Sequence, residues 1–298
     1  MIILNWNGWP ATRQCLSGLV EHVDRDDVRV IVVDNNSRTD NFADFQSLFP
    51  TIEFIRLERN RGFSGGSNFG LQRANDLVNK YALLLNNDAL VHRGFLEPLI
   101  SALETDERRA AASAVILQDG NDALYGRTFS LGTGVITSGR LSDLENQPYV
   151  ISDFVSGCAV LLRMSALKDV GFFDEQFFAY FEDVDLSLRL RKAGYLVGYA
   201  TASRVDHEGS LSVAGADGTT SELKHYLMMR NSLLLVRKHG SIGEKLIFYC
   251  IATPVRLAYY TAGFVLRLRW KKLRSLYRGA LDGYLGRGGR PPAELLGE

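Results

Sequence analysis

The first 117 residues alternate short apolar runs with longer amphipathic stretches, and this alternation restricts the fold more than any other feature. Runs rich in Ile, Leu and Val predict strands, and the stretches between them predict helices. The sequence therefore favours an α/β fold with a Rossmann-like, mostly parallel sheet flanked by helices. The expected strands are 1–4, 28–33, 52–57, 81–85 and 110–117, and the expected helices are 10–22, 40–48, 64–79 and 93–105.

The pattern changes after residue 120. Glycine-punctuated β segments, including 154–163, extend to about residue 164, and helices are expected at 182–193 and 220–239. With 298 residues, 46% of them hydrophobic and 23% charged, the composition is that of a folded globular protein rather than a disordered or fibrous one. We expect a catalytic-size α/β domain at 1–220 and a helical region at 221–298.

The zero net charge hides an asymmetry, because residues 1–221 carry a net charge of −9 and residues 222–298 carry +9. We expect no nucleic-acid partner for the chain as a whole. Segment 246–266 is apolar apart from Arg256, and six basic residues follow within 267–278. This arrangement predicts contact of 246–278 with an anionic membrane surface. The alternative is a helical hairpin that packs on the catalytic domain and has a solvated basic face.

The three cysteines are few and far apart in the sequence, and they form neither a zinc motif nor a disulfide framework. The N-terminus has neither the basic region nor the long apolar region of a signal peptide. We therefore expect a cytoplasmic protein that is peripheral on the inner face of the plasma membrane.

Two polar turns follow predicted strands, DNNS at 34–37 and NND at 86–88. Asn, Asp and Ser are also the ordinary residues of tight turns. However, ligands of open parallel sheets bind outside the carboxyl ends of the strands, so two such turns on one edge favour a polar-ligand site. Between them lies NRGFSGGSNFG at 60–70, which matches neither the dinucleotide fingerprint nor a P-loop. Its glycines would admit an anion to a helix N-terminus, although caps and loops use these residues more commonly.

Three carboxylates, Glu182, Asp183 and Asp185, begin a predicted helix. Acidic residues in a first turn complement the helix dipole, which is reason enough for their presence. The aromatic residues around them predict a partly enclosed environment, where a carboxylate has a raised pKa and acts as a general base. A lone histidine such as His207 is more commonly structural or simply exposed. The alternative is a metal site that it completes with Asp88, a mixed donor set that suits Mn²⁺ or Mg²⁺.

The motifs in their order resemble the inverting GT-A glycosyltransferases of family 2, in particular the bacterial rhamnosyltransferase-like members, over residues 1–240. The matching pieces are ILNWNG (3–8), VDNNS (33–37), NRGF (60–63), GSN (66–68), LNND (85–88), SGCA (156–159), GFFD (171–174), EDVD (182–185), His207, and Tyr226 with Arg230-Asn231.

The resemblance implies roles for these residues. Asp183 would be the general base with Glu182 beside it, and Asp88 and His207 would bind Mn²⁺ or Mg²⁺. Asp34 would contact the base or ribose of the donor, and Arg230 the diphosphate. The residues expected at the nucleotide sugar are Asn5, Asp34, Asn60, Gly62, Asn68, Asn87 and Arg230.

Two features depart from the family pattern. Only one carboxylate occupies the metal-binding turn, and the chain begins almost inside its first strand, so we expect an upstream start or a short strand. The implied activity is transfer of a sugar, with L-rhamnose from dTDP-rhamnose as a candidate, to a lipid-linked or polysaccharide acceptor in cell-envelope glycan synthesis. Loops 120–150 and 208–220 would set specificity.

Two alternatives remain. A sugar-nucleotide pyrophosphorylase would carry a glycine-rich loop near the first strand, where this chain has NWNGWP at 5–10. A non-catalytic membrane scaffold with a degenerate glycosyltransferase fold would have lost Asp88 or Asp183, and both are present.

Overall fold

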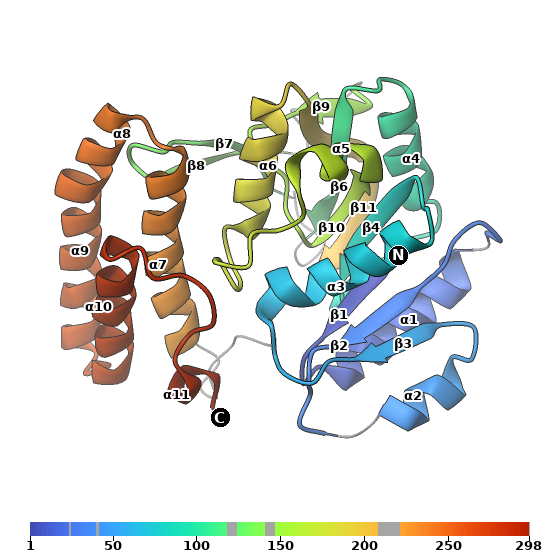
Figure 1. Ribbon diagram of the computed structural model, residues 1–298, viewed down its shortest axis with the longest axis horizontal. Coiled ribbons are helices and arrows are strands. Elements are labelled where there is room, and N and C mark those ends of the chain that lie inside the picture. The colour runs from blue at the N-terminus through green and yellow to red at the C-terminus, as the bar shows by residue number, and fades with distance from the viewer. Residues whose placement is uncertain (24, 40–41, 118–123, 141–146, 208–220, 298) are drawn as a thin grey trace.

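The computed structural model describes residues 1–23, 25–39, 42–117, 124–140, 147–207 and 221–297. A nine-stranded sheet carries helices on both faces, and a helical bundle stands beside it (Figure 1). The strand order is β3-β2-β1-β4-β10-β6-β11-β5, with β9 paired to β11. The sheet strands are β1 (Ile2–Asn5), β2 (Ile31–Asp34), β3 (Glu53–Arg56), β4 (Tyr81–Asn86), β5 (Ala89–Val91), β6 (Arg109–Leu117), β9 (Tyr149–Ile151), β10 (Ala159–Arg163) and β11 (Leu196–His207).

Most of the sheet is parallel, as the sequence predicts. Strands β1, β2, β3, β4, β6 and β11 run in one direction, whereas β10 is inserted antiparallel between β4 and β6. The helices around the sheet are α1 (Trp9–His22), α2 (Phe42–Leu48), α3 (Gly62–Asp76), α4 (Leu96–Glu104), α5 (Met164–Val170) and α6 (Glu182–Lys192). A separate hairpin consists of β7 (Leu124–Phe129) and β8 (Ile136–Arg140).

The two faces of the sheet have separate cores. Ile3 packs with Leu16 of α1 and Leu99 of α4 on one face, and its neighbour Ile2 packs with Leu71 of α3 and Leu186 of α6 on the other. Adjacent strand residues point to opposite faces, so a strand that is apolar throughout requires helices on both sides. Because the parallel strands run in one direction, their carboxyl ends lie at one edge of the sheet.

The sequence did not predict β5 or β11. Strand β5 has only three residues, and β11 mixes small, polar and apolar residues along its length. Of the predicted β segment 154–163, only Ala159–Arg163 forms a strand. The expected specificity loops 120–150 and 208–220 lie partly and wholly outside the described residues, as does the expected boundary at residue 220.

The C-terminal residues form helices that pack beside the sheet, on the left in Figure 1. Helix α10 lies along α7, and α9 packs on both of them through Phe264 and its neighbours. Among the described residues, no helix has both the length and the apolar character needed to cross a bilayer. The elements are α7 (Glu222–His239), α8 (Ile242–Ile247), the π-helical turn η3 (Phe248–Ala252), α9 (Thr253–Leu266), α10 (Trp270–Tyr284) and α11 (Ala293–Leu296).

The side chain of Arg256 turns toward α7, where its Nη1 lies 3.5 Å from Ser232 Oγ, and burial lowers its pKa. The guanidinium of Arg256 therefore does not lie on the outer face of α8, η3 and α9. Ile251, Val255 and Tyr259, spaced four residues apart, are 60%, 63% and 75% exposed. Helices α9 and α10 thus form a hairpin as in the alternative expectation, but it packs on α7, and the exposed side of η3 and α9 is apolar where a basic face was expected.

Candidate active site

Asn5 and Asp34 end the neighbouring strands β1 and β2, and both are fully buried. The Asn5 amide donates to Asp34 Oδ1 over 3.0 Å and to Ser37 Oγ over 3.1 Å. The other oxygen of Asp34 lies 3.5 Å from Arg56 Nε. These bonds order the turn after β2, so in this structure the carboxylate of Asp34 supports the edge of the sheet from within.

Asn87 joins the turn after β4 to the same network. Its amide donates to Thr12 Oγ1 over 3.0 Å, to the carbonyl of Gly8 over 3.3 Å and to Asn5 Oδ1 over 3.4 Å. The two polar turns expected at one edge are therefore connected through Asn5, which confirms that they meet.

Asn60 and Gly62 shape the glycine-rich entry to α3. The Asn35 amide donates to Asn60 Oδ1 and to the carbonyl of Gly62, each over 3.0 Å. Gly62 has φ +72°, and a Cβ there would lie 2.3 Å from the carbonyl oxygen of Phe178. Glycine is required because a side chain would be strained and would collide with the backbone that leads into the acidic helix. Asn35 is a functional candidate that the sequence placed only in a turn.

The side-chain amide of Asn68 is already hydrogen-bonded within the fold. Its amide donates to the carbonyl of Phe173 and its Oδ1 accepts from the N–H of the same residue, both over 2.9 Å. The side chain thus holds the backbone of the GFFD segment. This geometry supports a structural role in place of the expected contact with the nucleotide sugar.

Asp88 and His207 lie side by side, as expected. Strand β5 pairs antiparallel with β11 so that His207 stands opposite Ala89, the residue after Asp88. His207 Nε2 is 3.1 Å from Asp88 Oδ1, and the two side chains are 12% and 9% exposed. Burial and the charge of Asp88 raise the pKa of Cys15 to about 12, which keeps this nearby thiol protonated.

The carboxylate oxygen and imidazole nitrogen form a donor set that fits Mn²⁺ or Mg²⁺. Across the described part of the chain, His, Cys, Asp and Glu side chains form no group of three that could hold a metal ion.

The three carboxylates in the first turn of α6 lie in different environments. Glu182 is 6% exposed, and its Oε2 has no hydrogen-bond partner among the described atoms. Burial and the charge of Asp183 raise the pKa of Glu182 well above its usual range. Burial also raises the pKa of Asp183, although the N–H groups of Gly157 and Val184 donate to it over 3.2 and 2.8 Å.

Asp185 lies at the centre of a buried cluster of ion pairs. Its Oδ1 lies 2.7 Å from both His239 Nε2 and Lys238 Nζ, and its Oδ2 lies 2.8 Å from Arg189 Nε. Burial opposes ionisation, but the hydrogen bond from His239 and the charges of Arg189 and Lys238 prevail and lower the pKa of Asp185 to about 2. All three carboxylates are enclosed to some degree, but the raised pKa that the sequence predicts is found for Glu182 and Asp183 and not for Asp185.

One short segment before β10 links Asp88 and His207 to these carboxylates. The N–H of Gly157 binds Asp183, and the carbonyl of the next residue, Cys158, accepts from the N–H of Asn86 over 2.7 Å. The Asn86 amide in turn lies 3.3 Å from His207 Nε2. The SGCA motif thus brings together two halves of the site, a role that its sequence alone does not reveal.

Arg230 is only 1% exposed and points into the fold. Its guanidinium donates to Asn231 Oδ1 and to the carbonyls of Gln176, Phe177 and Gly289, over 2.8 to 3.3 Å. Because these backbone groups occupy the guanidinium, the structure supports a structural role for Arg230 in place of the expected contact with the diphosphate.

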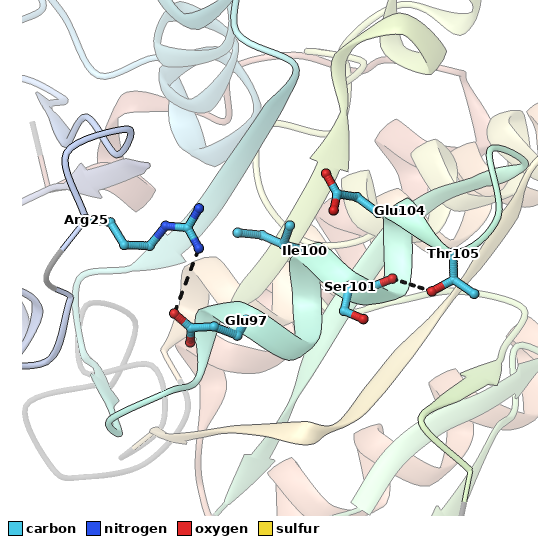
Figure 2. A pocket seen from close by; sticks show the side chains of 6 residues that line it. All are labelled: Arg25, Glu97, Ile100, Ser101, Glu104 and Thr105. Carbon is cyan, nitrogen blue, oxygen red and sulfur yellow. Dashed lines mark hydrogen bonds and ion pairs between the residues drawn. The ribbon is translucent and has the colours of Figure 1, made fainter.

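Figure 2 shows a pocket elsewhere on the molecule, between α4 and the segment before β2. Arg25 Nη1 approaches Glu97 Oε1 to 4.0 Å, and Thr105 Oγ1 donates to the carbonyl of Ser101. Arg25 precedes β2 and Thr105 precedes β6, so this pocket lies at the amino ends of the strands. It contains none of the expected site residues.

The central mixed sheet with helices on both faces is the GT-A fold. The mannosyltransferase PcManGT from Pyrobaculum calidifontis, solved in complex with GDP-Man and Mn²⁺, matches 95% of this chain and 86% of its own, with a TM-score of 0.59 at 16% identity. A likeness at this identity establishes the fold.

The chain belongs to glycosyl transferase family 2, because the model of that family matches residues 1–171, more than half of the chain. The low-salt glycan biosynthesis hexosyltransferase Agl10 of Haloferax volcanii is 24% identical, with 88% of this chain and 84% of that protein covered. The N-acetylglucosaminyl-diphospho-decaprenol L-rhamnosyltransferase of Mycobacterium tuberculosis is 25% identical, with 67% and 72% covered. The protein is therefore an enzyme that transfers sugars, as the resemblance implied.

Proposed function

We propose that the protein is an inverting glycosyltransferase that moves a sugar from a nucleotide-sugar donor to a hydroxyl of a lipid-linked or polysaccharide acceptor in cell-envelope glycan synthesis. The main support is the segment 156–158, which contacts both parts of the site. The N–H of Gly157 donates to Asp183, and the carbonyl of Cys158 accepts from the N–H of Asn86 at the end of β4. This segment sets the distance between the residue that would remove a proton and the pair that would hold the metal ion.

Asp183 would remove the proton from the acceptor hydroxyl. The hydroxyl oxygen then attacks the anomeric carbon, and the bond from that carbon to the diphosphate breaks with its electron pair on the diphosphate. Burial raises the pKa of Asp183 and strengthens it as a base, while the N–H of Gly157 keeps it oriented. Glu182 lies beside it with no hydrogen-bond partner for its Oε2 among the described atoms, and burial together with the charge of Asp183 raises the pKa of Glu182.

Asp88 and His207 would hold the divalent cation, Mn²⁺ or Mg²⁺. When bound, it neutralises charge on the leaving diphosphate. Asn5, Asp34, Asn60 and Gly62 order the neighbouring turns at the donor side, and Asn87 connects them to the metal-binding turn.

The donor sugar that we propose is L-rhamnose, carried by dTDP. Support comes from the similarity to the rhamnosyltransferase of Mycobacterium tuberculosis, whose name also specifies a diphospho-decaprenol acceptor. A lipid-linked acceptor would require the enzyme to work at a membrane, and we place it on the inner face of the plasma membrane.

The helical hairpin supplies a surface for that location. The apolar stripe Ile251–Val255–Tyr259 is exposed. Arg267, Lys271 and Arg274 of the same helical region are also exposed, and their charge favours anionic lipid. Apolar side chains at the bilayer boundary and cations at the headgroups would act together.

Thermal unfolding with UDP, dTDP, GDP and CMP, each with and without Mn²⁺, tests the donor site. A ligand at 100 times its Kd adds about 2.7 kcal/mol, enough for a shift of a few degrees in Tm. We expect a shift with dTDP that Mn²⁺ enlarges. A larger shift with another nucleotide would replace dTDP, and no shift with any would contradict the donor site.

Asp183→Asn tests the base. The variant should bind the nucleotide as the wild type does and lose transfer by about 100-fold or more, since general-base catalysis typically contributes 10²–10⁴-fold. Asp169→Asn is the matched control, because Asp169 lies at the exposed end of α5. Full transfer by Asp183→Asn would remove Asp183 from the base role.

Co-sedimentation with vesicles tests the membrane surface. Binding to vesicles that contain phosphatidylglycerol should exceed binding to phosphatidylcholine alone. Reversing Arg267 and Lys271 to Glu should weaken it at least tenfold, at roughly 1 kcal/mol for each basic residue. The same reversal of Lys168 and Lys192, which are exposed elsewhere, is the control. Equal loss in both double variants would argue against a localised surface.

A further inference from the structure

The loop before the acidic helix has an unusual backbone. Phe178, Tyr180 and Phe181 have φ values of +63°, +68° and +72°. Bulky side chains rarely adopt this region, and such strain persists only where the surrounding structure enforces it. Since Glu182 and Asp183 follow directly, whatever holds this loop also sets the direction of the proposed base.

The Asn231 amide donates three of the hydrogen bonds that hold the loop. Asn231 lies on α7, is fully buried, and its Nδ2 donates to the carbonyls of Phe177, Ala179 and Tyr180 over 2.7, 2.7 and 2.8 Å. The Asn231 Oδ1 accepts from Arg230 Nε over 2.8 Å. This bond fixes which end of the amide faces the loop, because only the NH₂ group can donate to carbonyls.

The C-terminal segment holds the loop from outside. The N–H of Gly289 donates to the carbonyl of Gln176 over 2.6 Å, and the carbonyl of Gly289 accepts from Arg230 Nη1 over 2.8 Å. A Cβ at Gly288 would lie 2.8 Å from the Cβ and 2.9 Å from the carbonyl oxygen of Gln176. On the inner side, the N–H of Ser64 donates to the carbonyl of Phe178 over 3.0 Å.

We infer that Asn231, oriented by Arg230 and backed by the segment at Gly288 and Gly289, is a positioning residue that aims Asp183 at the acceptor hydroxyl. The inference rests on the proposed function, because it takes Asp183 as the base. It also makes the C-terminal region a part of the catalytic apparatus, and it predicts an effect on turnover rather than on donor binding.

Asn231→Asp tests the inference with an isosteric change. A carboxylate keeps the bond to Arg230 but places oxygen against three carbonyl oxygens, so the loop is released. Misplacement of a catalytic group by about 1 Å lowers turnover about 100-fold, so kcat should fall by that order while KM for the donor changes less than about threefold. Asn79→Asp is the matched control, because the amide of Asn79, in the loop after α3, donates to a single carbonyl, that of Ala74 in α3.

Gly288→Ala is the second variant, for the case that Asn231→Asp does not fold. Gly288 is exposed, so the fold should tolerate the methyl group, and the methyl pushes on Gln176 from outside. We expect a tenfold or greater fall in kcat with the donor KM unchanged. Unchanged kcat in both folded variants, or a raised donor KM at constant kcat, would overturn the inference. Absence of transfer and of a nucleotide-induced Tm shift in the wild type would instead refute the proposed function.

Discussion

The prediction that the structure specifies most fully concerns Asp185. Its carboxylate is fully buried and meets His239, Lys238 and Arg189 at 2.7, 2.7 and 2.8 Å. Replacement by Asn leaves these groups facing a neutral amide. Removing one partner of a buried ion cluster costs about 3–5 kcal/mol, and we expect the free energy of unfolding to fall by about this amount at pH 7.

The pH dependence gives an independent magnitude. The pKa of Asp185 is lowered from about 3.9 in the unfolded chain to about 2 in the fold, a difference worth about 2.6 kcal/mol. A lowered folded-state pKa stabilises the fold at pH values above the unfolded pKa, and the contribution disappears as the pH falls through the folded pKa. The gap between wild type and Asp185→Asn should therefore be constant from pH 5 to 7 and shrink below pH 4.

Urea denaturation followed by circular dichroism measures both quantities. Asp27→Asn is the matched control, because Asp27 pairs with Arg25 at the surface with its side chain 69% exposed, and we expect no measurable change. An Asp185→Asn variant within 1 kcal/mol of the wild type, or a gap that grows as the pH falls, would refute the reasoning about the buried cluster.

Two further predictions concern the glycine-rich entry and the metal-binding pair. Gly62→Ala should lower the free energy of unfolding by about 3 kcal/mol in urea denaturation, because alanine is strained at a positive φ and its Cβ would lie too close to the backbone of Phe178. The control is Gly243→Ala, which has open space around it and should not destabilise the fold. Asp88→Asn should raise the Mn²⁺ concentration needed for half-maximal transfer more than about tenfold, because it removes the negative charge beside His207. The control is Asp206→Asn, on the same strand as His207, which should leave this concentration unchanged. Equal metal dependence in these two variants would exclude Asp88 as a ligand.

Much of the sheet and the edge that carries the site could be predicted from the sequence. Apolar runs and turn residues are local signals, and they located the strand ends at Asn5, Asp34 and Asn86 to within a residue or two. The resemblance to family 2 supplied the pairing of Asp88 with His207, which local patterns left as one option. Helix α6 was expected from its acidic start and basic end.

Roles that depend on distant partners were not predictable in this way. Asn68 and Arg230 belong to the motifs of the family, yet both hold backbone segments in this structure. Asn231 was part of the same motif and was not singled out, because nothing in its own neighbourhood shows that a strained loop lies opposite it.

The sequence by itself determined the alternation that builds the sheet, the placement of polar turns at its carboxyl edge, and the uneven distribution of charge. Tertiary structure alone decided which carboxylates at the start of α6 have a raised pKa and which has a lowered one. Asp185 is held ionised because α7 brings His239 and Lys238 to it, whereas Glu182 is buried without such a partner. The pKa of a carboxylate depends on burial and on the charges around it, and the fold sets both.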